Sequence, residues 1–157
     1  MNYRRAEVRD IPVLADLRKK QLIDEGQKPD LDMDYELTDY FEKKMSDGSL
    51  VEWVAEEDER IIATGAIIFM DFPPSFTNKT GKQGYIANMY TDPDFRGRGI
   101  ASEILERLAK EARERHIHKL ILYASKWGRP VYQKYGFRDA GAWMELKAVT
   151  LQGSPLQ

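Results

Sequence analysis

The chain has 157 residues, of which 42% are hydrophobic and 32% charged, as expected for one globular domain rather than a disordered chain. It has no cysteine and two histidines, which excludes disulfides and thiolate chemistry and argues against a structural zinc site. The net charge of -2 does not favour nucleic acid, and no apolar run has the roughly eighteen residues of a membrane helix. We expect a cytoplasmic, metal-free domain.

The first third of the chain predicts a strand and two helices. Residues 3–6 can form a short strand, and Asp10 is a suitable N-cap for a helix that runs to about Glu25. Aromatic and aliphatic residues recur at helical spacing over residues 35–45, and Gly48 follows that run. The order is therefore strand, helix, helix.

The middle of the chain predicts three strands. Residues 50–56 and 60–70 flank the polar turn 57–59, which is typical of an antiparallel hairpin. Residues 75–83 are polar and predict a loop, and residues 84–91 predict a further strand.

The clearest helix begins near residue 100. Its apolar positions fall on one stripe, formed by Ile100, Ile104, Leu105, Leu108, Ala109 and Ala112. The apolar run 119–124 then predicts a buried strand. Strand, helix and strand in this order indicate a parallel pair joined by a right-handed crossover.

The last part of the chain predicts a short helix and a pair of strands. The helix covers about residues 127–135, and residues 137–142 and 143–149 can form a closing strand pair. We expect a single domain over residues 1–149 and a C-terminal tail over residues 150–157.

A glycine-rich turn precedes the long helix and carries the chemistry. Gly97 and Gly99 remove side chains at the helix N-terminus, where backbone amides have no internal partner and the helix dipole is positive. Arg96 and Arg98 add positive charge beside them. This arrangement predicts a site for a phosphate or pyrophosphate group.

The same residues allow three other interpretations of this turn to be compared with a phosphate site. The glycines can simply form a tight turn with solvated arginines, and this alternative stays open because short glycine motifs are weak signals. A Rossmann site would need a third glycine where Ser102 stands and a carboxylate after the next strand, which ends Tyr123-Ala124-Ser125. A P-loop would need Gly-Lys-Ser or Gly-Lys-Thr, and neither occurs.

Two motifs together resemble the GNAT superfamily of N-acetyltransferases. Residues 96–101 fit its pyrophosphate signature Arg/Gln-x-x-Gly-x-Gly/Ala, and Pro93 stands three residues before it. Residues 128–137 resemble the tyrosine-bearing helix of that family, which ends in Gly-Phe. The resemblance covers about residues 3–149. It implies an α/β fold with a central, mostly antiparallel twisted sheet, one splayed parallel strand pair, and helices on both faces.

The resemblance implies acetyl-CoA as cosubstrate, bound between strands 84–91 and 119–124. Backbone groups of the first strand would bind pantetheine and polarise the thioester carbonyl, and the glycine-rich turn would bind the pyrophosphate. The implied cofactor-binding residues are Met89, Tyr90, Thr91, Arg96, Gly97, Arg98, Gly99, Ile100, Ala101, Ser102 and Ser125.

The resemblance assigns Tyr132 as the general acid that protonates the leaving thiolate. Tyr135, three residues later, is expected to be a core side chain. Ser125 stands where the family often has an asparagine that binds pantetheine. Strand 84–91 contains no glutamate or histidine, so Glu25, Asp71 and a water chain all remain candidates for the general base.

The acceptor is expected to be a primary amine of a small molecule or peptide. Between residues 24 and 52 there are three lysines and ten acidic residues: Asp24, Glu25, Asp30, Asp32, Asp34, Glu36, Asp39, Glu42, Asp47 and Glu52. Such a surface would attract a cationic amine, although a solvated helix face explains the same charges. An acyl-CoA sensor without turnover is the alternative function, and a homodimer is a candidate assembly.

Overall fold

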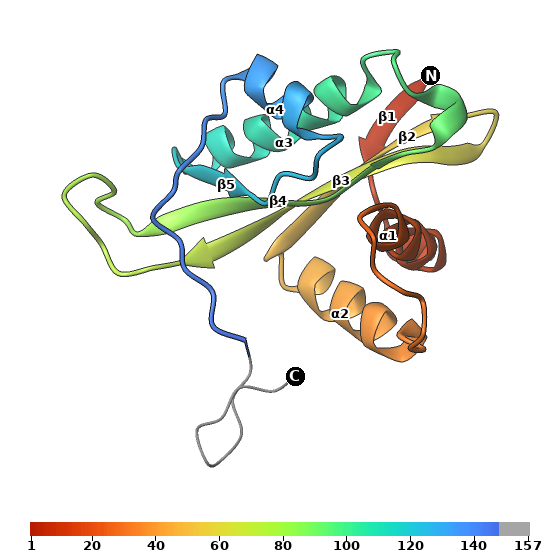
Figure 1. Ribbon diagram of the computed structural model, residues 1–157, viewed down its shortest axis with the longest axis horizontal. Coiled ribbons are helices and arrows are strands. Elements are labelled where there is room, and N and C mark those ends of the chain that lie inside the picture. Colours follow the sequence, from red (N-terminus) through yellow and green to blue (C-terminus); the bar gives the residue numbers. More distant parts are fainter. Residues whose placement is uncertain (148–157) are drawn as a thin grey trace.

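The computed structural model describes residues 1–147, which fold around one mixed sheet of five strands (Figure 1). The strand order in the sheet follows the chain. β1 to β4 pair antiparallel, whereas β4 and β5 pair parallel. The strands are β1 (Asn2–Arg5), β2 (Leu50–Glu57), β3 (Arg60–Asp71), β4 (Lys82–Thr91) and β5 (Leu120–Leu122).

Helices cover both faces of this sheet (Figure 1). α1 (Ile11–Asp24) and α2 (Asp34–Ser46) pack against one face, while α3 (Ile100–Glu114) and α4 (Arg129–Tyr135) lie on the other. Short 3-10 turns, Val8–Asp10 and Pro93–Phe95, lead into α1 and toward α3. No helix within residues 1–147 has the length and apolarity needed to cross a bilayer.

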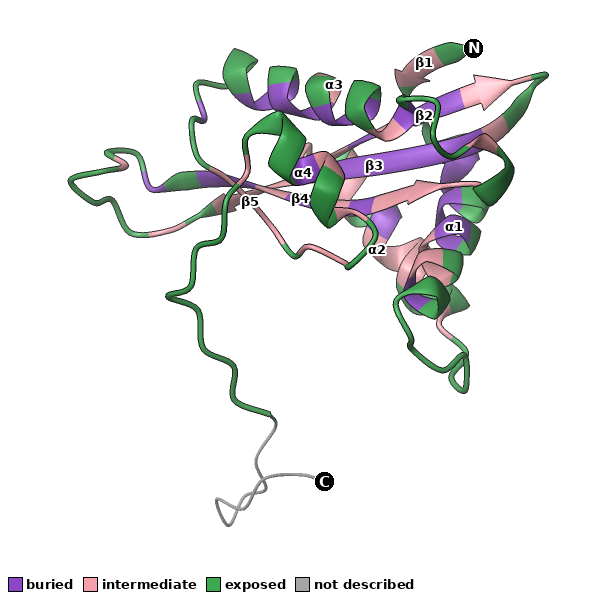
Figure 2. Ribbon diagram, turned by 45° about the horizontal axis from the view of Figure 1, so that its top comes forward, coloured by how far each residue is buried: buried purple, intermediate pink, exposed green. Residues whose placement is uncertain are grey.

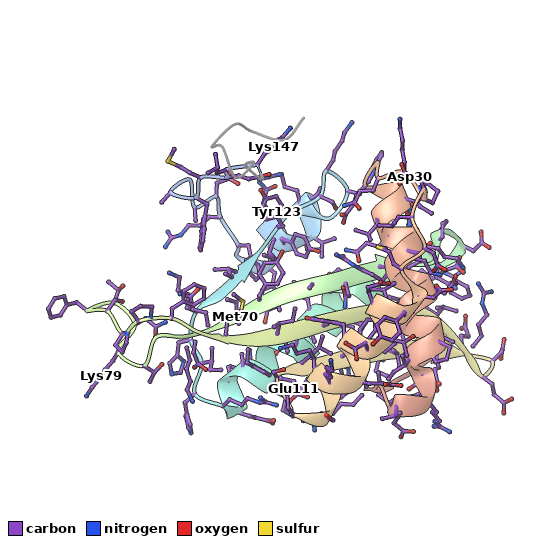
Figure 3. All side chains as sticks on the ribbon, turned by 90° about the horizontal axis from the view of Figure 1, so that it is seen from below. Asp30, Met70, Lys79, Glu111, Tyr123 and Lys147 are labelled. Atoms are coloured by element: carbon purple, nitrogen blue, oxygen red, sulfur yellow. The ribbon has the colours of Figure 1, made fainter. Side chains whose placement is uncertain are left out.

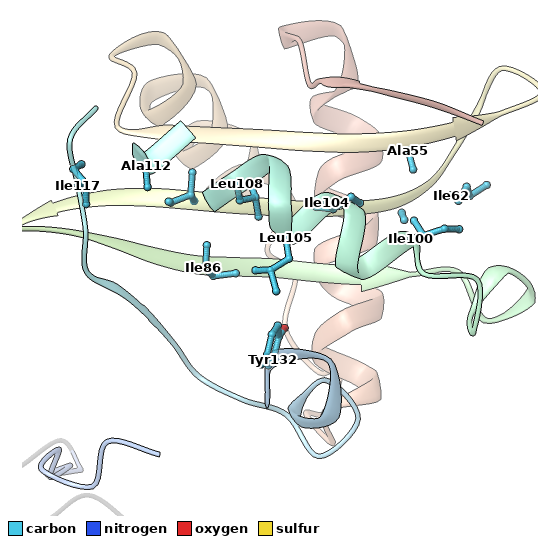
Figure 4. Packing of buried hydrophobic residues seen from close by; sticks show 12 residues of the cluster. Ala55, Ile62, Ile86, Ile100, Ile104, Leu105, Leu108, Ala112, Ile117 and Tyr132 are labelled. Atoms are coloured by element: carbon cyan, nitrogen blue, oxygen red, sulfur yellow. The ribbon is translucent and has the colours of Figure 1, made fainter. Parts of the chain in front are cut away.

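Two apolar layers form the core, one on each face of the sheet (Figure 2). On the α3 face, Ile104, Leu105 and Leu108 are fully buried, as the apolar stripe of this helix predicts (Figure 4). On the α1 and α2 face, Phe41 packs with Leu14 and the inward side chains of β2. Alternation along each strand thus divides its side chains between the two layers.

An irregularity interrupts the pairing of β3 with β4. Thr64 pairs with Tyr90 and Ala66 pairs with Ala87, so two residues of β4 lie opposite one residue of β3. One of these two residues, Asn88, has a positive φ of 56°. This is a β-bulge, which bends the strand and changes the direction of the side chains that follow.

The parallel pair is short. Only Gly84–Ile86 of β4 pair with Leu120–Leu122 of β5, whereas β4 continues to Thr91. Beyond Ile86 the two strands therefore diverge, and the edge of β4 that faces away from β3 has no strand partner among the described residues.

The predicted mixed sheet with one splayed parallel pair and flanking helices is confirmed. The predicted closing strands at residues 137–142 and 143–149 are wrong as far as the structure describes them, because no strand occurs between residues 137 and 147. Trp143, Met144 and Leu146 are 67%, 97% and 79% exposed. The residues of this segment pair with no strand and stay exposed, and strand propensity without such packing does not make a strand. Residues 148–157 lie outside the described part.

Candidate functional site

A cavity of about 370 Å³ opens where β4 and β5 diverge. Its walls come from the end of α1, the end of β4, the turn before α3, and α4. All of the site residues expected from the sequence line it except Arg98: Met89, Tyr90, Thr91, Arg96, Gly97, Gly99, Ile100, Ala101, Ser102, Ser125 and Tyr132. Residues distant in the sequence therefore meet in one place.

The glycine-rich turn presents free backbone amides to this cavity. Gly97 and Gly99 have φ values of 77° and 79°, and a Cβ at either would meet nothing within 4 Å. The left-handed backbone, rather than crowding, is therefore what requires glycine at these positions. Gly99 is the N-cap of α3, and the next three residues carry helix amides that have no partner within the helix.

The two arginines of the turn have different roles. Arg96 donates from Nε to the carbonyl of Thr91 at 2.8 Å and from Nη2 to Asp24 at 2.9 Å, which ties the end of β4 to α1. Arg98 instead stacks on the ring of Phe95 at 4.9 Å and does not line the cavity. The Arg98 side chain thus lies outside the cavity, and binding of pyrophosphate by its backbone amide stays a prediction.

Tyr132 belongs both to the cavity wall and to the core. It is 8% exposed and points from α4 toward the cluster beneath α3 (Figure 4). A Cβ on Gly128 would lie 2.8 Å from its ring, so a glycine one turn earlier makes room for it. Burial, with smaller contributions from Glu25 and Tyr85, raises the pKa of Tyr132 to about 12. The phenol therefore keeps its proton at neutral pH.

Tyr135 does not occupy the core position expected from the sequence. It is 38% exposed, and its hydroxyl donates to Glu106 of α3 at 2.5 Å. A phenol needs a partner for its hydroxyl, and the outer face of α3 supplies one. Phe137, half-buried and near both tyrosine rings, takes the apolar role instead.

Ser125 lies at the cavity and closes the turn into α4. Its Oγ accepts a hydrogen bond from the Gly128 amide at 3.0 Å. The side chain that stands in place of the usual asparagine thus helps to fix the helix that carries Tyr132.

The two carboxylates considered as general bases lie in different places. Glu25 follows the last residue of α1, lines the cavity, and accepts a hydrogen bond from Gln21 at 3.2 Å. Asp71 ends β3 opposite Lys82 and does not line this cavity. Gln21 and Asp24 line it as well. Gln21 stands three residues before Asp24 and four before Glu25, a spacing that brings side chains together on one helix face.

Much of the acidic segment is already engaged within the chain. Asp34 pairs with Lys19 at 2.5 Å, and Asp39 pairs with Lys43 at 2.9 Å. Asp30 is exposed beyond the C-terminal end of α1 (Figure 3) and does not line the cavity. Of the ten acidic residues, Asp24 and Glu25 are the two that line the cavity.

Glu52 is the most deeply buried carboxylate of this segment, at 2% exposure. Its Oε1 accepts from the Thr64 hydroxyl at 2.7 Å, and its Oε2 accepts from the Asn88 amide at 3.5 Å. Burial raises its pKa to about 7, against the lowering effect of these two bonds and of Arg18 on α1. Tyr40 on α2 also faces it, and its own pKa is raised by burial and by Glu52.

This raised pKa predicts a specific pH dependence of stability. Between its unfolded pKa of about 4.5 and its folded pKa of about 7, Glu52 is more protonated in the folded chain, so stability falls as pH rises through this window. The Glu52→Gln variant removes this dependence. Urea unfolding at pH 5 and pH 8 gives the free energy of unfolding of each protein. Between these pH values the free energy of unfolding of the variant should rise by about 3 kcal/mol relative to that of the wild type, at about 1.4 kcal/mol per pKa unit. Identical pH profiles of the two proteins would contradict this.

Among residues 1–147, no group of three or more histidine, cysteine or carboxylate side chains is arranged to hold a metal ion. The charged side chains that line the cavity are Arg96, Asp24 and Glu25.

Comparison with known proteins gives a consistent result. A family model described as the acetyltransferase (GNAT) family matches residues 6–137. A crystal structure of a predicted acetyltransferase with acetyl-CoA from Clostridium acetobutylicum is 60% identical, with a TM-score of 0.91 over 93% of this chain and 95% of that chain.

Curated relatives are more distant. A probable glucosamine 6-phosphate N-acetyltransferase 2 of Oryza sativa subsp. japonica is 33% identical over 59% of this chain and 54% of its own length. A thialysine N-epsilon-acetyltransferase of Sus scrofa is 28% identical over 41% of this chain and 39% of its own length. The chain thus spans about half the length of the first curated relatives it matches.

Proposed function

The chain belongs to the GNAT family of acetyltransferases, and on this premise we propose that it transfers the acetyl group of acetyl-CoA to a primary amine by direct attack in a ternary complex. The observation that carries the proposal is one cavity that combines an unpaired strand edge, the amides of a helix N-terminus and a buried phenol. These features suit the pantetheine, the pyrophosphate and the leaving thiolate, respectively.

The coenzyme would bind mainly through backbone groups. An extended pantetheine can pair with the free edge of β4 at Met89 and Thr91, as a peptide strand adds to a sheet. Its pyrophosphate would accept from the amides that follow Gly99, at the positive end of the α3 dipole. Arg96, which bonds to Thr91 and Asp24, supports this wall from the solvent side.

A side chain at position 99 tests this placement. Gly99→Glu adds a bulky anion where the pyrophosphate would lie, and we expect acetyl-CoA affinity to fall by more than about tenfold, or 1.4 kcal/mol. Gly48→Glu is the matched control, because Gly48 has a φ of 76°, no atom within 4 Å of its Cβ position, and a location after α2. Calorimetric titration of both folded variants gives the answer. Equal affinities would contradict the placement.

In the reaction, the neutral amine nitrogen attacks the thioester carbon, and the carbon–sulfur bond breaks after a tetrahedral intermediate. The amide at Met89 or Tyr90 would donate to the developing oxyanion. Tyr132 would then protonate the departing thiolate. Its pKa of about 12 makes it a weak acid in the free protein, but the same apolar wall also disfavours an uncompensated thiolate. The amine loses its proton to Glu25 or to water.

Replacing Tyr132 separates the chemical step from binding. Tyr132→Phe keeps the ring and its packing, so kcat should fall by roughly 10²–10⁴-fold with little change in acetyl-CoA affinity. Tyr135→Phe is the control, since that hydroxyl bonds Glu106 on the outer face of α3. Steady-state kinetics of the two variants with one amine acceptor tests the assignment. A larger loss in Tyr135→Phe would move the acid to that residue, and unchanged kcat in both would leave solvent as the proton donor.

The charge of the cavity favours a cationic acceptor. Asp24 and Glu25 line it, and Asp24 is already paired with Arg96. Glu25 is therefore the carboxylate left to attract an ammonium group and to take its proton. Among the cavity-lining residues Arg96 is the one basic side chain. Little positive charge is therefore available to bind the phosphate of a phosphorylated acceptor. An aminoalkyl acceptor, as the name of the thialysine relative denotes, fits this charge better than a sugar phosphate does.

Neutralising Glu25 tests the acceptor side. Glu25→Gln should raise KM for a cationic amine about tenfold while KM for acetyl-CoA changes little, because one short-range charge interaction is removed. Asp30→Asn removes the same charge from the exposed loop outside the cavity, and it should change neither constant. Equal effects of both variants on the amine KM would instead assign the attraction to the acidic surface as a whole.

Two further expectations belong to the proposal. Exposed Trp143, Met144 and Leu146 give the segment after α4 an apolar surface that suits a second copy of the chain, which supports a homodimer. The cysteine-free composition is compatible with a reducing cytoplasm, which supports a cytoplasmic location.

A further inference from the structure

The mechanism above gives no role to the carboxylate of Glu52, which is 2% exposed. We propose that Glu52 is a positioning residue, which clamps the bulge of β4 and thereby sets the backbone of Met89–Thr91 at the cavity wall. This inference rests on the proposed function for its catalytic consequence. The clamp itself is a property of the fold.

The geometry of the sheet lets Glu52 reach across an intervening strand. Glu52 lies on β2 opposite Ala66 of β3, and Ala66 in turn lies opposite Ala87 of β4. Because Ala66 is small and buried on the same face, the longer side chain can pass over it. Glu52 thus bonds Thr64 on β3 with one oxygen and Asn88 on β4 with the other. Both sides of the bulge are tied to one carboxylate.

The bulge decides where the next residues point. Ile86 packs in the α3 layer, and Met89, three residues later, also lies there, within reach of Ile104 and Gly65. In a regular strand an odd spacing would place these two side chains on opposite faces. The extra residue Asn88 shifts the alternation of side chains between the two faces by one position. Its conformation therefore fixes the orientation of the segment that the coenzyme would contact.

Asn88 needs this support because its backbone is strained. A positive φ of 56° is unfavourable for a residue with a side chain, although asparagine tolerates it better than most. Its side chain is buried, and its amide donates to Glu52. Without the carboxylate, a buried amide would lose its acceptor, and the bulge could relieve the cost by changing conformation. Glu52 itself does not line the cavity, so it acts through Asn88.

The test compares two buried glutamates on opposite faces of the sheet. Glu52→Ala removes the clamp, and Glu52→Gln keeps an acceptor oxygen at this position. Glu111→Ala is the matched control, because Glu111 on α3 (Figure 3) is 4% exposed and bonds Arg5 and Trp53 away from the cavity. The measurements are calorimetric acetyl-CoA affinity, kcat and KM, unfolding free energy, and amide hydrogen exchange at residues 89–91.

Both alanine variants should lose stability, but only Glu52→Ala should weaken acetyl-CoA binding, by about tenfold, and accelerate exchange at residues 89–91. Glu52→Gln should restore the affinity to within about threefold of the wild type. If Glu52→Ala does not fold, Asn88→Ala replaces it, because alanine lacks the side-chain amide but keeps a Cβ at the same positive φ. Wild-type affinity and exchange in the folded clamp variant would overturn the proposal. Failure of the wild type to bind acetyl-CoA would count against the proposed function, while the exchange comparison would still decide the clamp.

Discussion

The structure of the site depends on the difference in length between the two parallel strands, β4 and β5. β4 continues for five residues beyond Ile86, but β5 ends at Leu122, where its pairing with β4 stops. Backbone amides and carbonyls along the free edge then face a cavity instead of a strand, and such groups need partners. An extended ligand with its own amides can provide these partners, so it would occupy the position that a neighbouring strand would take beside β4.

The other features of the site follow from this divergence. The chain leaves β4 through a turn whose positive φ values require Gly97 and Gly99, and it enters α3 with its first amides directed at the same cavity. On the α4 side of the cavity, the absence of a side chain at Gly128 leaves room for the ring of Tyr132, which lines the cavity beyond the end of β5. Arg96 and Glu52 secure the β4 wall at two points, the first from solvent and the second from the core.

Local chemistry was readable from the sequence, whereas long-range register was not. The apolar stripe of α3 and the glycine-rich turn each depend on neighbouring residues; the stripe is buried as predicted and the turn lines the cavity, while its binding of pyrophosphate stays a proposal. The sequence groups Glu52 with an acidic surface, whereas the structure buries it. Nothing in the run Leu50–Glu57 shows that this side chain faces α1 and α2, or that a small alanine stands opposite it on β3. Tyr135 and the residues after Phe137 were misplaced for the same reason, since the faces and edges they meet are set by distant segments.

The most direct test of the account is amine-dependent release of thiol from acetyl-CoA, followed with a chromogenic thiol reagent across a panel of amines. The chain has no cysteine, so the protein itself gives no background. One thiol should be released for each acetylated amine, and cationic aminoalkyl acceptors should be preferred over phosphorylated amino sugars. Tight binding of acetyl-CoA without thiol release for any amine would contradict it and would identify the chain as an acyl-CoA sensor.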